Sequence, residues 1–445
     1  MSRPTTAPLV SDSVAAIAAR ARQASRALAQ LSTEARNHAL LAIASAMEAN
    51  AQKITEANAR DLNAAEPEVA AGRMPSAMFA RLQVTGRGIA QMAAQIREVA
   101  RLDDPLGRRL STTELDDGLI LYKESCPFGV VGVIFESRPD ALPQLASLAL
   151  KSGNAILLKG GAEAAHTNEA LVAIWRECLK QFPAIPSDSI HLLHSRADVN
   201  EMLALDRDVD LIIPRGSYAL VQFIMAHSRI PVLGHSEGVC HVYVDRAADL
   251  AKAIDVAYDA KVQYPAVCNA AETLLVHRVI AENFLPRMVA KLKAANVEIR
   301  GDSKTIALLP EEGIVPATEE DWRTEYSDLI LSVKVVADIE EAIEHINRFG
   351  SRHTDAIVTE DADAARRFMN EVDSAGVFHN ASTRFADGYR YGLGAEVGIS
   401  TSKLHARGPM GLEGLTTYKW KLVGKGHTVA PYASGEKTFK HRLSK

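Results

Sequence analysis

Cysteine is scarce in this sequence, and its pattern excludes two common uses of the thiol. The 445 residues include 4 cysteines, which are Cys126, Cys178, Cys240 and Cys268. So few cysteines in so long a chain, with no Cys-x-x-Cys pair among them, exclude a disulfide framework. No two of the 14 histidines stand four residues apart, and no Cys/His cluster has the spacing of zinc ligands, so we expect no metal site. A cysteine with a special role is therefore expected to be a reactive thiol.

An excess of one charge sign and a long apolar run are also missing. The chain carries 50 Lys and Arg against 55 Asp and Glu, a formal net charge of −5, so it lacks the basic footprint of a protein that binds nucleic acid or anionic membranes. The longest uncharged stretch is 216–228, which is shorter than the roughly 20 apolar residues of a spanning helix. Residues 1–20 lack an apolar signal-peptide core and contain Arg3, Asp12 and Arg20, so we expect a cytoplasmic protein.

The chain is long enough for two or three domains of roughly 100–200 residues each. Residues 13–29 and 33–51 are rich in alanine, and Leu, Ile and Met return every three or four residues. This periodicity predicts helices, which we expect to form an outer layer or a helical arm. Near residue 117 the pattern changes to short β-rich runs at 118–123 and 129–135, which predict a protruding ribbon that leads into a core strand.

Downstream of the ribbon, strand-like and helix-like segments alternate. The first set of predicted strands is 155–158, 189–193 and 211–213, and the set after 242–244 is 273–276, 329–336, 356–358 and 376–378. Predicted helices between them include 162–181, 339–348 and 361–372. This alternation is typical of βαβ units in parallel sheets with helices on both faces, and the number of strands predicts two α/β domains.

Two predicted strand-to-helix junctions have the composition of a phosphate-binding turn. One is Lys159-Gly160-Gly161, and the other is 214–217, which contains Gly216 and Ser217. Glycine lets the backbone approach a ligand, and a helix N-terminus presents N–H groups to an anion. The alternative is that each glycine serves the turn alone. A strict G-x-G-x-x-G motif is absent, which argues against the commonest NAD fingerprint but leaves other modes of dinucleotide binding open.

Among the cysteines, the position of Cys268 is distinctive. Cys178 lies in a helical run, Cys126 in the ribbon and Cys240 in a strand-like run, and a small apolar side chain suits each of these places. Cys268 lies within 263–272, where a predicted helix has ended and a strand is about to begin. Loops at such junctions display side chains toward clefts. Cys268 is therefore the candidate nucleophile, with a structural role as the alternative.

Seven separate segments, in order along nearly the whole chain, together resemble one known family. They are 127–139 (PFGVVGVIFESRP), 213–217 (IPRGS), 267–272 (VCNAAE), 380–385 (NASTRF), 394–401 (GAEVGIST), 405–409 (HARGP) and 415–418 (LTTY). The chain resembles the glutamate-5-semialdehyde dehydrogenases, also called gamma-glutamyl phosphate reductases, which belong to the aldehyde dehydrogenase superfamily.

The resemblance implies a fold and a reaction. The implied α/β fold has a Rossmann-like cofactor domain at 1–117 and 138–245, an α/β catalytic domain at 246–379, and a β oligomerisation arm at 118–137 and 410–445. The implied reaction is the NADPH-dependent reduction of L-glutamyl 5-phosphate to L-glutamate 5-semialdehyde and phosphate in proline biosynthesis. The implied assembly is a homodimer or a higher homo-oligomer. An association with glutamate 5-kinase, which makes the acyl phosphate, is left open.

The resemblance also assigns roles to individual residues. Cys268 matches the catalytic cysteine, whose thiolate attacks the acyl phosphate. Arg138 falls near the position of an oxyanion-binding asparagine in many relatives; it is a candidate for that role or for neutralising the phosphate. Arg384 is a charge-based candidate for binding the substrate, with a structural salt bridge as the alternative. The implied cofactor contacts are Lys159 at the adenosine ribose, Gly216 and Ser217 at the pyrophosphate, and Glu325 at the nicotinamide ribose. Gly160 and Gly161, which follow Lys159, are further candidates for binding the cofactor.

One departure from the superfamily pattern separates two functions. Oxidising relatives carry a glutamate, in an E-L-G-G-K stretch, that activates water to hydrolyse the thioester. Here the stretch is 234–238 (GHSEG), with no acidic residue at the matching position. A reductase that uses an acyl phosphate needs no such base, so the departure favours the reductase over a semialdehyde-oxidising enzyme, although Glu237 remains a candidate base. A binding or structural protein on the same scaffold is disfavoured because Cys268, Lys159 and Gly216 are all present.

Overall fold

The computed structural model describes residues 12–136, 138–234 and 237–444. These residues divide into two compact units, which we describe separately. Unit 1 contains the chain up to Leu233, Gly394–Val397 and the residues from Gly411 onward, and unit 2 contains Gly234–Leu393 and Gly398–Met410. Within the described ranges, no helix is both long and apolar enough to cross a membrane.

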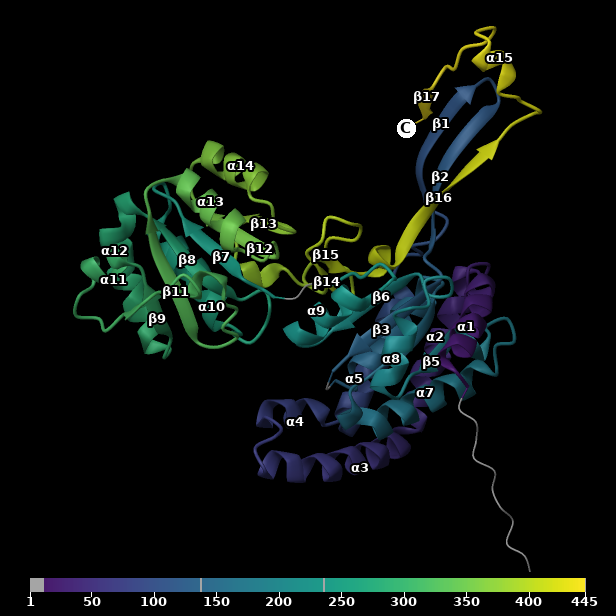
Figure 1. Ribbon diagram of the computed structural model, residues 1–445, viewed down its shortest axis with the longest axis horizontal. Coiled ribbons are helices and arrows are strands. Elements are labelled where there is room, and N and C mark those ends of the chain that lie inside the picture. Colours follow the sequence, from purple (N-terminus) through teal and green to yellow (C-terminus); the bar gives the residue numbers. More distant parts are fainter. Residues whose placement is uncertain (1–11, 137, 235–236, 445) are drawn as a thin grey trace, which may run out of the picture. The chain divides into compact units, whose positions relative to one another are not determined.

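Unit 1 is built on a parallel sheet with the strand order β5-β4-β3-β6 (Figure 1). Its strands are β3 (Val130–Phe135), β4 (Ala155–Lys159), β5 (Ile190–Leu192) and β6 (Leu211–Arg215). All six residues of β3 are buried, because a central parallel strand is covered on both faces. The carboxyl ends of these strands share one edge of the sheet, and the glycine turns predicted from the sequence follow β4 and β6 at this edge.

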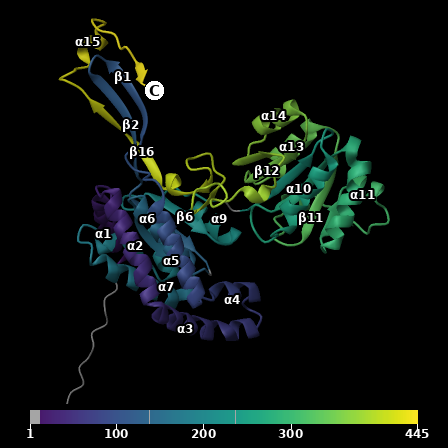
Figure 2. The ribbon, with the colours of Figure 1, turned by 180° about the vertical axis from the view of Figure 1, so that it is seen from behind.

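The helices of unit 1 form two groups: α1 to α5 precede the parallel sheet in the chain, and α6 to α9 follow its individual strands. They are α1 (Val14–Leu28), α2 (Thr33–Ala49), α3 (Ala51–Ala70), α4 (Ser76–Leu82), α5 (Gly86–Arg101), α6 (Ala141–Lys151), α7 (Ala165–Leu179), α8 (Arg196–Met202) and α9 (Tyr218–His227), with the 3-10 turns η1 (Ala162–Ala164) and η2 (Ser187–Ser189). Helix α5 shows why they form: Thr85 caps its first turn, and its buried residues return every three or four positions from Ile89 to Val99. Helices α2, α5 and α6 pack against one another (Figure 2).

The arm is an antiparallel sheet with the order β16-β2-β1-β17. Its strands are β1 (Arg109–Asp116), β2 (Leu119–Pro127), β16 (Thr416–Val423) and β17 (Arg442–Ser444), and the short elements beside it are η5 (Leu412–Leu415) and α15 (Ala430–Ala433). Strand β16 pairs with β2 along its whole length, from Thr416 opposite Pro127 to Val423 opposite Ile120. Since β16 is an edge strand with exposed Trp420 and Leu422, the arm offers unpaired backbone groups and apolar surface.

Unit 2 is a doubly wound parallel sheet with the order β10-β9-β11-β8-β7-β12-β13. The strands are β7 (Cys240–Val244), β8 (Ala271–His277), β9 (Glu298–Gly301), β10 (Val315–Pro316), β11 (Ile330–Val336), β12 (Thr354–Val358) and β13 (Gly376–His379). The helical elements are α10 (Leu250–Val262), α11 (Arg278–Ala294), α12 (Ser303–Leu308), η3 (Asp321–Arg323), α13 (Ile339–Phe349), α14 (Ala362–Glu371) and η4 (Thr383–Phe385). A separate hairpin pairs β14 (Gly398–Ser400) with β15 (Gly408–Met410).

Successive side chains along a strand point to opposite faces of the unit 2 sheet, so the sheet has an apolar core on each face. Val242 and Val244 of β7 pack with α10 and α11 on one face, whereas Tyr243, between them, packs with α13 and α14 on the other. This alternation follows from the period of two residues in a strand. Helices therefore cover both faces of the sheet, as the sequence predicted.

The predicted boundaries differ from the structure in three places. Strand β7 pairs with β8 and β12, so it belongs to unit 2, which starts at Gly234 rather than after residue 245. The arm contains β1, which was expected in the cofactor domain. Strand β3, which was expected in the arm, lies instead in the parallel sheet β5-β4-β3-β6. Unit 2 also continues beyond residue 379, because the chain around η4 packs back on it.

Candidate active site

The first glycine turn of unit 1 follows β4. Lys159 is the last residue of β4 and is half-buried, and Gly160 and Gly161 precede η1, which opens α7. A Cβ at Gly160 would lie 2.2 Å from Nδ2 of Asn168, and a Cβ at Gly161 would lie 2.0 Å from Oε1 of Glu163. A side chain at Gly160 would collide with the buried Asn168, whereas one at Gly161 would displace the end of the Glu163 side chain. The turn stands at the carboxyl edge of the sheet, where α/β domains bind their ligands.

The second glycine turn follows β6 and holds a carboxylate of this chain. Ser217 is the N-cap of α9, and its backbone N–H donates to Oε2 of Glu136 at 2.8 Å. A Cβ at Gly216 would lie 2.5 Å from the same oxygen, so glycine allows this close approach. The anion lies where the helix dipole and the first N–H groups of α9 favour negative charge. The donors of this turn therefore suit a phosphate group.

Arg138 also lies in unit 1, between β3 and α6. Its side chain is 54% exposed, and Nη2 forms a salt bridge with Oδ2 of Asp140 at 3.2 Å. An exposed guanidinium beside a single carboxylate keeps donors available for an anionic ligand. The structure thus places Arg138 in unit 1 and both Cys268 and Arg384 in unit 2.

Cys268 lies in the turn between α10 and β8, where the sequence predicted a loop, and its side chain is partly exposed. The backbone of Gly238 packs against this turn: a Cβ at Gly238 would lie 2.0 Å from the carbonyl oxygen of Cys268 and 2.5 Å from its Cα. The thiol of Cys240 donates to the same carbonyl oxygen at 3.3 Å. The main chain of the candidate nucleophile is therefore held by a glycine contact and by a buried thiol.

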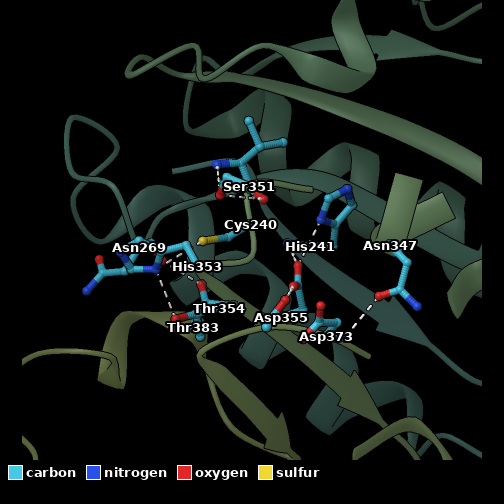
Figure 3. Close-up of polar contacts among 12 residues, drawn as sticks. Cys240, His241, Asn269, Asn347, Ser351, His353, Thr354, Asp355, Asp373 and Thr383 are labelled. Atoms are coloured by element: carbon cyan, nitrogen blue, oxygen red, sulfur yellow. Dashed lines mark hydrogen bonds and ion pairs between the residues drawn. The ribbon is translucent and has the colours of Figure 1, made fainter. Parts of the chain in front are cut away.

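Side chains join the segment after β13 to this turn. Thr383 Oγ1 donates to the carbonyl oxygen of Asn269 at 2.7 Å (Figure 3). Asn269 Nδ2 donates in turn to the carbonyl oxygen of Ala386 at 2.8 Å, and both polar side chains are buried. Arg384 lies between these two contacts in the sequence, so they fix its backbone beside the turn of Cys268.

Arg384 is a buried cation next to the candidate nucleophile. It is 7% exposed, and its Nε donates to Oε1 of Gln263 at 3.0 Å. Burial lowers the pKa of its guanidinium, the charge of Arg390 acts in the same direction, and a thiolate at Cys268 opposes both. Because this interaction is reciprocal, a charged Arg384 stabilises the thiolate of Cys268, the nucleophilic form. Arg384 forms no salt bridge with any residue that the structure describes, so the alternative of a structural ion pair gains no support.

The other three cysteines have thiols that resist ionisation. Cys126 lies in β2, Cys178 in α7 and Cys240 at the start of β7. Burial raises the pKa of each thiol, and at Cys240 it does so well above the usual value. Cys240 also lies 3.8 Å from Nδ1 of His353 (Figure 3). A thiol with a raised pKa stays protonated and is a poor nucleophile, so the buried Cys178 and Cys240 and the partly exposed Cys126 agree with structural roles.

Two carboxyl groups lie at the same end of the unit 2 sheet as Cys268. Glu325 precedes β11, Cys268 precedes β8 and Gly238 precedes β7, and these parallel strands share an amino edge. Oε2 of Glu325 accepts the N–H of Gly238 at 2.9 Å. Burial raises the pKa of the Glu237 carboxyl, and the charges of Glu325 and Glu320 add to this effect. Because its pKa is raised, Glu237 remains a candidate general base.

Several residues that surround these groups were assigned no role in the site from the sequence alone. Gly238, Cys240, Asn269 and Thr383 surround the turn of Cys268, and Glu136 occupies the second glycine turn. Four of these five lie inside segments that carry the family resemblance or its one departure. Their pairing in space depends on which strands are neighbours, and a single sequence does not provide that information.

Comparison with known proteins gives the family. The aldehyde dehydrogenase family profile matches residues 6–307. The chain is 56% identical, over 423 residues, to the gamma-glutamyl phosphate reductase of Synechococcus sp. (strain JA-2-3B'a(2-13)), covering 95% of this chain and 92% of that protein. It is 54% identical over 422 residues to the enzyme of the same name from Natronomonas pharaonis, covering 95% of each chain.

Solved structures agree with the sequence relatives. The crystal structure of gamma-glutamyl phosphate reductase from Thermotoga maritima superimposes with a TM-score of 0.91 at 42% identity, covering 94% of this chain and all of that one. The glyceraldehyde-3-phosphate dehydrogenase GapN from Methanocaldococcus jannaschii, solved with NADP, shares the fold at 18% identity, with a TM-score of 0.64 and coverage of 93% and 94%. The predicted fold class is confirmed, and the chain belongs to the aldehyde dehydrogenase family.

Proposed function

We propose that this protein reduces L-glutamyl 5-phosphate to L-glutamate 5-semialdehyde with release of phosphate, and that it uses NADPH in proline biosynthesis. The observation that carries the proposal is the turn of Cys268, beside the buried cation Arg384, in a chain that is 56% identical to a gamma-glutamyl phosphate reductase. Cys126 is also partly exposed, but burial raises the pKa of its thiol despite the nearby charges of Lys419 and Lys421, whereas Cys268 lies beside the buried cation Arg384.

The proposed chemistry starts at Cys268 of unit 2. The Cys268 thiolate attacks the acyl carbon, the bond from that carbon to the phosphate oxygen breaks, and an acyl thioester remains on Cys268. When bound, NADPH supplies the hydride that converts the thioester carbon into the aldehyde and releases the thiolate. We assign the neutralisation of substrate charge to Arg384 and Arg138, since a guanidinium matches both carboxylate and phosphate.

The proposed cofactor contacts are those that the family resemblance implies. Gly216 and Ser217 suit the phosphates because the turn already accommodates a carboxylate oxygen. The Lys159 turn and Glu325 would meet the two riboses. The preference for NADPH over NADH rests on the likeness to gamma-glutamyl phosphate reductases, and titration with both dinucleotides tests it.

The proposed assembly is a homo-oligomer formed through the arm. Strand β16 presents exposed Tyr418, Trp420 and Leu422 along an edge, and pairing of such an edge with a second copy would cover it. An acyl phosphate is short-lived in water, so we further propose that the enzyme associates with glutamate 5-kinase, which makes this substrate. We also propose that the enzyme is cytoplasmic. Co-purification of the two proteins, with an arm-truncated variant as control, tests that association.

A second candidate function is oxidation of a small semialdehyde to its acid, and Glu237 favours it. Its raised pKa and its place next to Gly238, which packs on Cys268, are properties of a water-activating base. The two functions differ in their use of phosphate. We expect NADP⁺ reduction by glutamate semialdehyde to require inorganic phosphate, and we expect Glu237→Gln to retain this phosphate-dependent activity. Turnover that is independent of phosphate, and that Glu237→Gln abolishes, would support the oxidising function instead.

A further inference from the structure

The carboxylate of Glu136 occupies the turn that the proposed function assigns to the cofactor phosphates. Glu136 directly follows β3, and β3 pairs with β6 so that Phe135 stands opposite Arg215. This register places Glu136 beside Gly216 and Ser217 at the carboxyl edge of the sheet. The backbone N–H of Glu136 donates to the carbonyl oxygen of Arg215 at 3.1 Å, so the pairing extends to Glu136 itself.

The contacts of Glu136 use the donors that a phosphate needs. Oε2 accepts the backbone N–H of Ser217 at 2.8 Å, and Oε1 lies 3.4 Å from Oγ of the same residue. The missing side chain of Gly216 makes room for the carboxylate, since a Cβ there would lie 2.5 Å from Oε2 and 2.7 Å from Cδ. The carboxylate thus stands in for the phosphate oxygens of a ligand at this turn.

A phosphate and the Glu136 carboxylate exclude each other at this position. One N–H makes one strong hydrogen bond, and two anions at the same helix N-terminus repel. We infer that Glu136 is an internal competitor for the phosphate position at the Gly216–Ser217 turn and thereby sets the affinity for the dinucleotide. The inference rests on the proposed cofactor site, and it adds that part of the binding free energy is spent on displacing a carboxylate of the chain.

The competing explanation is that Glu136 only stabilises the turn. A purely structural carboxylate would help any ligand of the turn, or leave it unaffected, because it holds Ser217 in place. A competitor has the opposite effect on ligand affinity, since removing its charge strengthens binding. Glu136→Gln separates the two cases, because glutamine keeps an acceptor oxygen for the Ser217 N–H and loses the charge.

The test measures NADPH binding to the full-length protein in the absence of substrate, with the fluorescence of the cofactor as the readout. We expect Glu136→Gln and Glu136→Ala to bind NADPH roughly two- to fivefold more tightly than the wild type, which is the range for one exposed anion at a helix N-terminus. The advantage should shrink as the salt concentration rises from about 0.02 M to about 0.5 M, because salt screens the repulsion. Glu177→Gln is the matched control: it removes an exposed carboxylate near the far end of α7 and should leave the affinity unchanged.

The outcomes separate this inference from the proposed function. If the wild type binds NADPH and Glu136→Gln binds it equally or less tightly, Glu136 is not a competitor and the proposed function stands. If the wild type and Glu136→Gln both fail to bind NADPH or NADH, the proposed cofactor site itself is wrong. Thermal denaturation of each variant verifies that it is folded.

Discussion

Replacement of Gly238 by alanine tests how the main chain of the nucleophile is held. A Cβ at Gly238 would lie 2.0 Å from the carbonyl oxygen of Cys268 and 2.5 Å from both its carbonyl carbon and its Cα. All three are backbone atoms, so no side-chain rotation relieves the overlap. Real Cβ atoms essentially never approach a heavy atom closer than 3.0 Å. The two backbone segments must therefore separate by at least 3.0 − 2.0 = 1.0 Å.

A displacement of this size at a reacting group costs on the order of 100-fold in rate, or about 2.7 kcal/mol of activation free energy. We expect Gly238→Ala to lose about that factor in kcat, measured as phosphate-dependent NADP⁺ reduction by glutamate semialdehyde. The control is Gly86→Ala at the start of α5, where a new Cβ meets nothing within 4 Å and kcat should not change. A folded Gly238→Ala enzyme with wild-type kcat would refute this account of the Cys268 turn.

Two further predictions concern buried charges of unit 2. Nζ of Lys261 and Oε2 of Glu272 lie 2.5 Å apart, and both side chains are 0% exposed. Lys261→Met should lower the free energy of unfolding by about 3–5 kcal/mol in urea denaturation, because it leaves the buried charge of Glu272 unpaired. The double variant Lys261→Met/Glu272→Leu removes both charges and should recover most of the lost stability. An equal loss of stability in the single and the double variant would contradict this prediction. Although burial acts to raise the pKa of Asp321, hydrogen bonds from Thr318 and Arg300 hold that pKa well below its usual range. A depressed folded-state pKa contributes stability above the unfolded-state pKa of about 3.9 that is lost as the pH falls, so Asp321→Asn should flatten the decline of stability between about pH 5 and pH 2, and an unchanged slope would count against it.

Local sequence patterns were sufficient for the elements with regular apolar periodicity. The strands 273–276 and 356–358 lie within β8 and β12, and the helix predicted at 339–348 lies within α13. Each of them buries an apolar face in a core of unit 2, so the physical cause of the structure is visible in the sequence. The turn of Cys268 was found for the same reason, because it lies between two such elements.

Elements without that periodicity were not predicted. Strand β1 (Arg109–Asp116) is largely polar and has no buried residue, because its partners in the arm leave its side chains accessible. Strand β9 has four residues and buries two of them, which is too short for a period to appear. Strand β7 was recognised but placed in the first domain, since strand order in a parallel sheet depends on long-range packing and not on the local sequence.

The contacts around the candidate site were the least accessible to sequence reasoning. The approach of Gly238 to Cys268, and of Glu136 to Gly216, joins segments that lie on neighbouring strands. A glycine that makes room for another backbone leaves no chemical signature of its own. The family resemblance identified the segments that carry these residues, and the pairing of the strands shows what the glycines do.

The central claim is that Cys268 carries the acyl group during the reaction. The most direct measurement mixes the enzyme with NADP⁺ and glutamate semialdehyde in phosphate-free buffer, follows NADPH formation, and maps the acid-quenched protein by mass spectrometry. We predict one burst of NADPH equal to the concentration of active sites, a glutamyl adduct on the peptide that contains Cys268, no burst in Cys268→Ala, and continued turnover only after phosphate is added. Sustained turnover without phosphate, or an adduct on another residue, would contradict the account.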